Sequence, residues 1–137
     1  MEEAMTMIKT GTIHHLALTV TDSKSSRDFY VNLLGFQVLA EFDATRILSN
    51  GSLILVVKPA PDPANAPKDD RFDENHVGLD HLCLSVESLA DLAKAMAILD
   101  ERGVPHGEIE DLGDMGICVL TFRDPDNIQI ELSAPKN

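Results

Sequence analysis

A segment near the N-terminus of the chain occurs a second time, 66 residues further on. Residues 13–20 and 79–86 each contain a histidine, His15 and His81, followed by apolar residues that alternate with small or polar ones. Alternation with a period of two is typical of a half-buried strand, in which neighbouring side chains face opposite sides of the sheet. We therefore expect each histidine to point away from the apolar face of its strand.

The repeat continues beyond these two strands. Residues 22–34 and 88–102 have the apolar spacing of helices, and each stretch is followed by a glycine, Gly35 or Gly103, that can end a helix. The N-capping residues are Asp22 or Ser23 in the first helix and Ser88 in the second. Three strand-like runs follow each helix, at 36–42, 44–49 and 52–58 and, more loosely, at 104–111, 116–122 and 127–133. The sequence thus predicts an α+β fold built from two tandem β-α-β-β-β modules.

The last strand of each module can be aligned through the turn that precedes it. Pairing Gly51 with Asn127 gives a shift of 76 residues. The same shift pairs Leu55 with Glu131, so that only the second module has an acidic residue at this point. The alternation of apolar residues around Glu131 places its side chain on the face that is not apolar, which is also the face predicted for the two histidines.

Four prolines punctuate a stretch rich in Ala and Asp between the two halves. Proline cannot donate to a sheet and breaks a helix, so we interpret residues 59–77 as a crossover linker. Module one then covers about 13–58 and module two about 78–134, within a single domain of residues 1–137. At this length one core can form without disulfides or structural metals.

The charge of the chain disfavours two kinds of partner. Eleven basic and 23 acidic residues give a formal charge of −12, which disfavours nucleic acids and anionic membrane surfaces. No stretch reaches the roughly 20 apolar residues that span a bilayer.

Cys83 and Cys118 lie in predicted strands without the spacing of a zinc site, so we expect reduced, buried thiols and a cytoplasmic protein.

His15, His81 and Glu131 are the candidate metal ligands. Two imidazoles and one carboxylate can occupy three corners of a divalent ion's coordination sphere and leave others open for a substrate. A single histidine at the start of a strand is more often structural. Here the two histidines occupy equivalent positions of a repeat and the acid lies on the closing strand, and this coincidence favours a metal site.

These motifs resemble those of a known family. The sequence is similar to the vicinal-oxygen-chelate superfamily, also called the glyoxalase, bleomycin-resistance and extradiol-dioxygenase superfamily. The resemblance implies a cupped mixed sheet with helices on its outer face, a divalent metal bound by His15, His81 and Glu131, and a homodimer. The segments that show it are 15–35, 79–86 and 122–132, which include Phe29-Tyr30, Leu34-Gly35 and Phe122-Arg123-Asp124-Pro125-Asp126-Asn127.

One departure from the family limits what the resemblance implies. Glyoxalase I enzymes usually take a fourth protein ligand from the closing strand of the first module, where this chain is predicted to have Leu55. Three ligands instead resemble the extradiol dioxygenases and the fosfomycin-resistance transferases. Tyr30, the single tyrosine, lies on the apolar side of its helix, so we interpret it as a core residue rather than a catalytic acid.

Strand parity gives a provisional substrate pocket whose lining is mixed but mostly small and apolar, which suits a modest organic ligand. Arg46 and Arg123 are the cations that could meet an anionic substrate, with ordinary surface positions as the alternative. The predicted pocket residues are Thr19, Leu55, Cys83, Ser85 and Gln129.

The sequence analysis therefore predicts a metal-dependent enzyme of the lyase, isomerase or dioxygenase type, with Glu131 as both ligand and catalytic group. Its divalent ion acts as a Lewis acid on a small molecule that chelates through oxygen. Fe²⁺ or Mn²⁺ is favoured, and Ni²⁺, Zn²⁺ and Mg²⁺ stay open. The alternative is a metal-free protein that sequesters a drug, as bleomycin-resistance proteins do.

Overall fold

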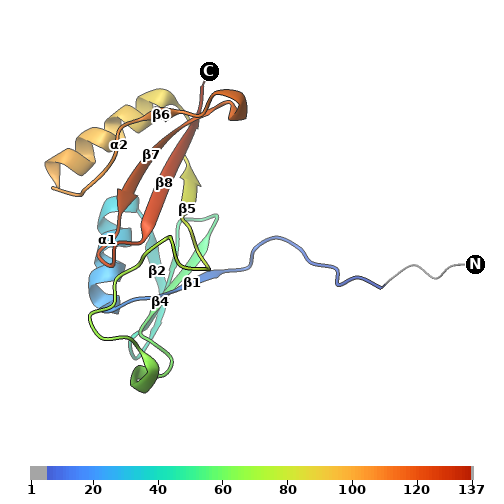
Figure 1. Cartoon of the computed structure of the whole chain (residues 1–137), viewed down its shortest axis with the longest axis vertical. Coiled ribbons are helices and arrows are strands. Elements are labelled where there is room, and N and C mark those ends of the chain that lie inside the picture. The colour runs from blue at the N-terminus through green and yellow to red at the C-terminus, as the bar shows by residue number, and fades with distance from the viewer. Residues whose placement is uncertain (1–5, 137) are drawn as a thin grey trace, which may run out of the picture. The chain divides into compact units, whose positions relative to one another are not determined.

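The computed structural model describes residues 6–136, and the chain divides into two compact units on either side of the bond between Pro59 and Ala60. Within the described residues, each unit contains one four-stranded sheet and one α-helix of 12 or 13 residues (Figure 1). Both sheets combine a parallel pair with antiparallel pairs. The predicted α+β fold of two β-α-β-β-β modules is confirmed.

The first unit follows the predicted order of elements. Its strands are arranged as β1-β4-β3-β2, with β1 parallel to β4 and the other neighbours antiparallel. The elements are β1 (Leu16–Thr19), α1 (Ser23–Leu34), β2 (Gln37–Phe42), β3 (Thr45–Ser49) and β4 (Ile54–Lys58).

The second unit repeats this topology with the strand order β5-β8-β7-β6, in which β5 is parallel to β8. The elements are η1 (Pro63–Asn65), β5 (Leu82–Ser85), α2 (Leu89–Glu101), β6 (Glu110–Asp111), η2 (Gly113–Met115), β7 (Ile117–Arg123) and β8 (Gln129–Pro135).

The helices begin and end where the sequence indicates. The Asp22 carboxylate accepts the backbone N–H groups of the first turn of α1, so of the two predicted caps the structure selects Asp22. Gly35 follows α1 with a left-handed φ of 75°, a conformation that a residue with a Cβ rarely adopts. Ser88 and Asp91 form a reciprocal capping box at the start of α2.

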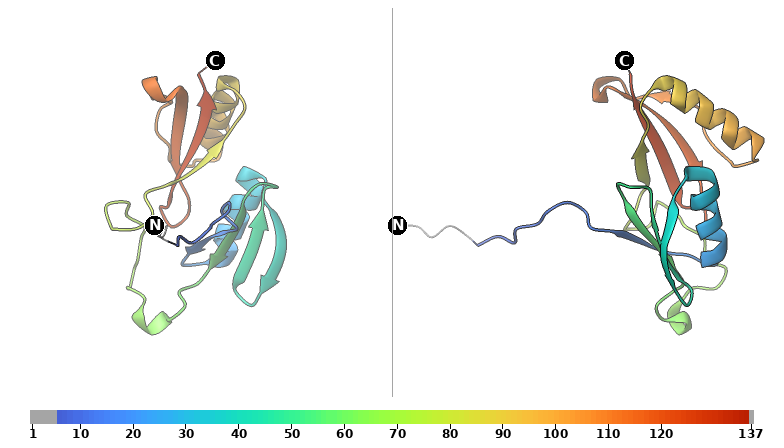
Figure 2. Two further views of the ribbon diagram at one scale, coloured as in Figure 1. Left: turned by 90° about the vertical axis from the view of Figure 1, so that its right-hand side faces the viewer. Right: turned by 180° about the vertical axis from the view of Figure 1, so that it is seen from behind.

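Each helix packs on one face of its own sheet, and that face is the apolar one (Figure 2). In the first unit Tyr30 and Phe36 are 0% and 1% exposed and meet edge to face, which confirms the core role expected for Tyr30. In the second unit Leu92 of α2 is buried, as are Leu120 and Ile130 of the strands beneath it. The opposite face of each sheet is therefore the one available for chemistry.

The register of the closing strands differs from the prediction by one residue. Leu16 of β1 lies opposite Leu55 of β4. In the second unit the equivalent leucine of β5 lies opposite Ile130, the residue before Glu131. Glu131 therefore corresponds to Val56, and the predicted equivalence of Leu55 with Glu131 is wrong. A slip of one residue moves every side chain to the other face of a strand.

Residues 104–111 form less strand than predicted. Only Glu110–Asp111 is paired as a strand, and His106 forms an isolated bridge with Phe122. The hydrogen bond from the His106 ring to Asp100, near the end of α2, raises the pKa of the imidazole, and the bond to the Gly107 carbonyl adds to the rise. Backbone bonds still link this segment to β7, from Gly107 to the Thr121 oxygen at 2.8 Å and from Arg123 to the Pro105 oxygen at 3.3 Å, but they do not form a continuous strand.

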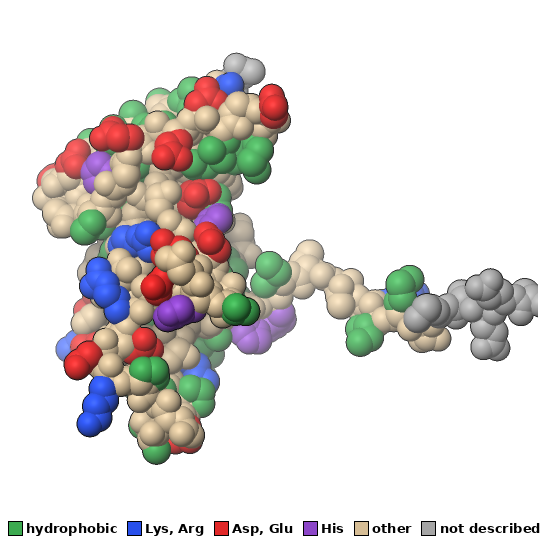
Figure 3. Space-filling view, viewed as in Figure 1, with side chains coloured by type: hydrophobic (Ala, Val, Ile, Leu, Met, Phe, Trp, Pro, Cys, Tyr) green, Lys and Arg blue, Asp and Glu red, His purple; other side chains and the backbone are tan. Residues whose placement is uncertain are grey.

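Acidic side chains are spread over the face of the molecule seen in Figure 3 and form no single cluster there. Among residues 6–136, no helix is both long and apolar enough to cross a membrane.

The turn between β7 and β8 is held by a nearly buried carboxylate. Asp124 is 6% exposed, and its Oδ1 accepts the backbone N–H groups of Asp126 at 2.9 Å and Ile128 at 2.8 Å. Asn127 occupies the left-handed region with φ 68°. This is the tight turn that the sequence predicts, and it leads directly into the strand that contains Glu131.

We expect Asp124→Ala to lower the free energy of unfolding by about 2–3 kcal/mol, because two buried N–H groups lose a charged acceptor. Asp124→Asn keeps an acceptor oxygen and should cost less. Urea unfolding followed by circular dichroism measures the difference, with the exposed Asp114→Ala as control. Equal stabilities of Asp124→Ala and Asp114→Ala would contradict the role assigned to this carboxylate.

Candidate functional site

His81 and Glu131 meet on the open face of the second sheet. His81 lies directly before β5, and Glu131 lies in β8, where it is the register partner of Cys83. The Nε2 atom of His81 is 3.7 Å from Oε1 of Glu131, and the two side chains are 37% and 18% exposed. Glu131 alternates with the buried residues Ile130 and Leu132, so it faces away from α2. The pair is accessible to a small molecule.

The second ring nitrogen of His81 is already bound. Its Nδ1 lies 2.7 Å from Oδ1 of Asp80. The side-chain amide of Gln129 donates from Nε2 to the backbone oxygen of Asp80 at 3.2 Å and to its Oδ1 at 3.1 Å. Only Nε2 of the imidazole therefore faces Glu131.

The spacing of this pair suits two ligands of one metal ion. Protein nitrogen and oxygen ligands lie about 2.1 Å from a small divalent ion, so two of them can be at most about 4.2 Å apart. The 3.7 Å between Nε2 of His81 and Oε1 of Glu131 lies inside that limit. Within residues 6–136 the structure gathers no group of three or more His, Cys, Asp or Glu side chains that could hold a metal ion.

His15, the third predicted ligand, belongs to the first unit. It lies directly before β1, as His81 lies before β5, and its side chain is exposed. Its Nδ1 is 3.0 Å from Nδ1 of His14. The structure thus brings two predicted ligands together within one unit and gives the third the equivalent position in the other.

Four of the predicted pocket residues lie on open sheet faces. Thr19 is exposed at the end of β1, on the opposite side from the buried Leu18. In the second unit the others, Cys83, Ser85 and Gln129, share the face of Glu131.

Leu55 does not lie on such a face. It is 0% exposed and belongs to the core beneath α1, because the register of β4 is offset by one residue from the predicted one. The side chain of β4 that faces the open side at this level is Val56, which is half-buried. The side chain of Val56 has no atom that can bind a metal, so the expectation that the first unit supplies no fourth side-chain ligand is the same for either register.

The two cysteines differ in their surroundings. Both are free; Cys118 is buried as expected, but Cys83 is exposed, so the prediction of a buried thiol is wrong for Cys83. Partial burial of the sulfur raises the pKa of the Cys83 thiol, and the Glu131 carboxylate adds to the rise although a bond with Ser133 opposes it. A raised pKa keeps the thiol protonated and unsuited to act as a nucleophile.

The two arginines singled out in the sequence are both engaged in ion pairs. Arg46 lies on the α1 side of its sheet and bonds to Glu41 at 2.9 Å and to the Ser23 hydroxyl at 3.2 Å. Arg123 lies on the same face as Gln129 and Glu131. Its guanidinium donates to both carboxylate oxygens of Glu74, at 2.8 Å and 3.0 Å.

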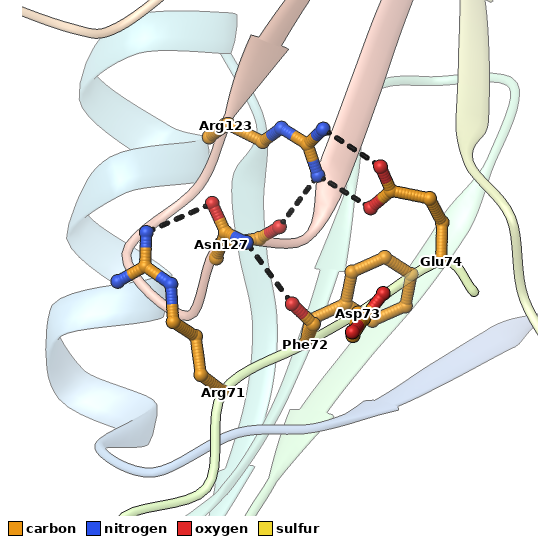
Figure 4. A pocket seen from close by; sticks show the side chains of 6 residues that line it. All are labelled: Arg71, Phe72, Asp73, Glu74, Arg123 and Asn127. Carbon is orange, nitrogen blue, oxygen red and sulfur yellow. Dashed lines mark hydrogen bonds and ion pairs between the residues drawn. The ribbon is translucent and has the colours of Figure 1, made fainter. Parts of the chain in front are cut away.

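Glu74 is a residue that the sequence did not single out. It comes from the predicted crossover linker, 49 residues before Arg123, and no spacing or motif links the two. The bidentate pair lies at a pocket of about 420 Å³ (Figure 4). Arg71 also reaches this pocket and donates to Oδ1 of Asn127 at 3.0 Å. The residues that line the pocket are Arg71, Phe72, Asp73, Glu74, Arg123 and Asn127.

Comparison with known proteins establishes the family. The sequence model of the Glyoxalase/Bleomycin resistance protein/Dioxygenase superfamily matches residues 12–132. The protein YwkD of Bacillus subtilis (strain 168) is 35% identical over 127 residues, which are 88% of this chain and 94% of YwkD. The crystal structure of a glyoxylase/bleomycin resistance protein/dioxygenase domain from Frankia sp. EAN1pec has a TM-score of 0.77 and 30% identity, covering 94% of this chain and 95% of that one. The chain therefore belongs to this superfamily, whose members bind small-molecule substrates and commonly use a divalent metal.

A catechol-2,3-dioxygenase of the same Bacillus subtilis strain is 29% identical over 136 residues. The match covers 96% of this chain but 45% of the dioxygenase, so the chain spans about half the length of that relative.

The Glu74–Arg123 pair predicts a particular acid dependence of stability. The hydrogen bonds from Arg123 lower the pKa of Glu74 from its ordinary 4.5 to about 2. A carboxyl group whose pKa falls on folding stabilises the protein above its unfolded pKa, and that contribution is lost as the pH falls through the folded pKa. The difference in unfolding free energy between the wild type and Glu74→Gln should therefore shrink as the pH falls from about 5 to about 2.

Chemical denaturation at a series of pH values measures this difference. Glu101→Gln, at the exposed end of α2, is the control. A difference for Glu74→Gln that stays constant, or that grows on acidification, would be incompatible with the ion pair.

Proposed function

We propose that this protein is a metal-dependent enzyme in which His15, His81 and Glu131 hold a divalent ion that activates an oxygen-chelating small molecule. The observation that supports the proposal most directly is the 3.7 Å approach of His81 Nε2 and Glu131 Oε1 on an open sheet face. A neutral imidazole and a carboxylate that meet in this way are ordinary ligands of Fe²⁺, Mn²⁺ and related ions. His15 joins them in the proposal because it occupies the same place before β1.

The donor set favours Fe²⁺ or Mn²⁺, with Ni²⁺, Zn²⁺ and Mg²⁺ as further candidates. When bound, such an ion supplies a Lewis acid that polarises a carbonyl or hydroxyl oxygen of the substrate. Three protein ligands leave coordination positions open for two substrate oxygens. This proposal restricts the substrate class to small molecules with adjacent oxygen atoms.

The protein's own contribution is orientation and proton transfer. Glu131 is 18% exposed and lies on the open face, where it can accept a proton from a substrate bound beside it. Cys83, Ser85 and Gln129 lie on this face, and Thr19 lies on the open face of the first sheet. We propose that these side chains position the substrate.

The proposed reaction is of the lyase, isomerase or dioxygenase type rather than that of a four-ligand glyoxalase I. The position of the first unit that corresponds to Glu131 is Val56, which supplies no ligand and no base. The similarity to a catechol-2,3-dioxygenase supports a substrate with two adjacent oxygens. We further propose a homodimer, as is common in the superfamily, and a cytoplasmic location.

Isothermal titration calorimetry of Mn²⁺ binding to the metal-stripped protein tests the ligand set. We expect His15→Ala, His81→Ala and Glu131→Gln each to weaken Mn²⁺ binding by more than about 100-fold, because losing a direct ligand exceeds the 10- to 100-fold cost typical of an outer-shell change. His76→Ala, at an exposed loop histidine, is the matched control and should bind Mn²⁺ as the wild type does.

Unchanged Mn²⁺ affinity in His81→Ala and Glu131→Gln would overturn the proposal. It would favour the metal-free, drug-sequestering alternative, provided that a small-molecule ligand still binds to the stripped protein. Elemental analysis of the protein as purified identifies the ion.

A further inference from the structure

A series of hydrogen bonds connects the predicted ligand His81 to four further polar side chains. His81 bonds to Asp80, and Asp80 bonds to Gln129. Gln129 in turn accepts from Arg123 at 3.4 Å, and Arg123 is held by both carboxylate oxygens of Glu74. None of these four residues is itself a proposed metal ligand, so the ligand set alone does not account for them.

From this arrangement we infer that Asp80, held in place by Gln129, is a positioning residue that selects the Nδ1–H tautomer of His81 and so presents the Nε2 lone pair to a metal ion. This inference rests on the proposed function, because it assigns a role toward the same metal site.

The argument for the tautomer begins with the donors and acceptors involved. A neutral imidazole has one N–H group, and a carboxylate is an acceptor only. The 2.7 Å contact between Nδ1 of His81 and Oδ1 of Asp80 therefore requires the hydrogen to be on Nδ1. Nε2 then has a free lone pair, and this atom is the one that faces Glu131. Metal-bound histidines commonly donate their other N–H to a carboxylate in the same way.

The orientation of Gln129 is also determined by its partners. An amide has one end that donates and one that accepts, and the guanidinium of Arg123 can only donate. Oε1 of Gln129 must therefore face Arg123, which leaves Nε2 to donate to the backbone oxygen and to Oδ1 of Asp80. Two bonds from one amide hold both the main chain and the side chain of Asp80. Asp80 is 67% exposed, and without them its carboxylate would rotate freely in water.

The first unit lacks this arrangement. The register places His14, Ile54 and Ser49 where the second unit has Asp80, Gln129 and Arg123. His14 stands beside His15 where Asp80 stands beside His81, and the Nδ1 atoms of the two histidines lie 3.0 Å apart. The series of bonds is therefore a property of the His81 half of the repeat and not of the fold as such.

Nuclear magnetic resonance of the metal-free protein tests the inference directly. Long-range ¹H–¹⁵N correlation spectra at about pH 8.5, where imidazoles are neutral, distinguish the two tautomers, and the His81→Ala spectrum identifies the His81 signals. We expect the Nδ1–H form of His81 in the wild type and a mixture of both forms in Asp80→Ala. Gln129→Leu should give a smaller change in the same direction, and Asp80→Asn, which keeps an acceptor oxygen, should retain most of the Nδ1–H form.

Mn²⁺ affinity provides the second readout. Asp80→Ala should bind Mn²⁺ about 10-fold more weakly than the wild type, at the lower end of the range for outer-shell partners because Asp80 is exposed. Asp80→Asn should lose less. Glu87→Gln removes a charge from the same unit, just after β5, and should change neither the tautomer nor the affinity. This control separates a local effect from a general loss of negative charge.

The outcomes separate this inference from the proposed function. If His81→Ala and Glu131→Gln keep their Mn²⁺ affinity, the metal site is wrong, whatever the tautomer. If those two variants lose Mn²⁺ while Asp80→Ala keeps both the wild-type tautomer and the wild-type affinity, the metal site stands and the role of Asp80 is overturned. A change of tautomer without a change of affinity would also overturn that role, because positioning would then have no consequence for the metal.

Discussion

The parallel pairing of β5 with β8 is the interaction on which the candidate site depends. His81 and Glu131 are 50 residues apart in the sequence, and they meet because Cys83 and Glu131 are register partners in this pair. Parallel neighbours cannot be joined by a hairpin, so the chain must cross over, and α2 lies in that crossover. The helix covers one face of the sheet with apolar contacts, and the other face is left for polar side chains.

Much of this arrangement could be predicted from residue patterns. The alternation after His15 and His81, the caps Asp22 and Ser88, and the turn at Asp124 are local signals. Local hydrogen bonds form at the two caps and at the turn, whereas the two alternating strands pair with the distant β4 and β8. The predicted register of the first closing strand was wrong because the two turns differ in length. Asn50 accepts the N–H of the residue three positions on, whereas Asp124 accepts that of the residue four positions on. One additional residue in the turn is enough to exchange the two faces of the strand.

The hydrogen bonds that link His81 to Glu74 through Asp80, Gln129 and Arg123 could not be predicted in the same way. Gln129 lies 49 residues from Asp80, and Arg123 lies 49 residues from Glu74. Such pairs have no period and no fixed spacing, and their geometry depends on where a long linker returns to the sheet. The sequence alone shows Arg123 as a cation on a strand, but its partner Glu74 decides its role. Both terminal nitrogens of the Arg123 guanidinium donate to Glu74, so Arg123 has a structural role within the second unit.

The two halves of the repeat share a topology and differ in chemistry. In the first unit the open face of β4 has Ile54 and Val56 where β8 has Gln129 and Glu131. Apolar side chains at these positions can line a cavity for an organic ligand, but they cannot bind a metal or orient an imidazole. The repeat keeps a histidine before the first strand of both copies, but an acid in the closing strand of only one. The first strands β1 and β5 are therefore alike in chemistry, whereas the closing strands β4 and β8 differ. The second unit thus carries a carboxylate beside an imidazole that is bonded to Asp80, and the first carries an imidazole and an apolar strand face.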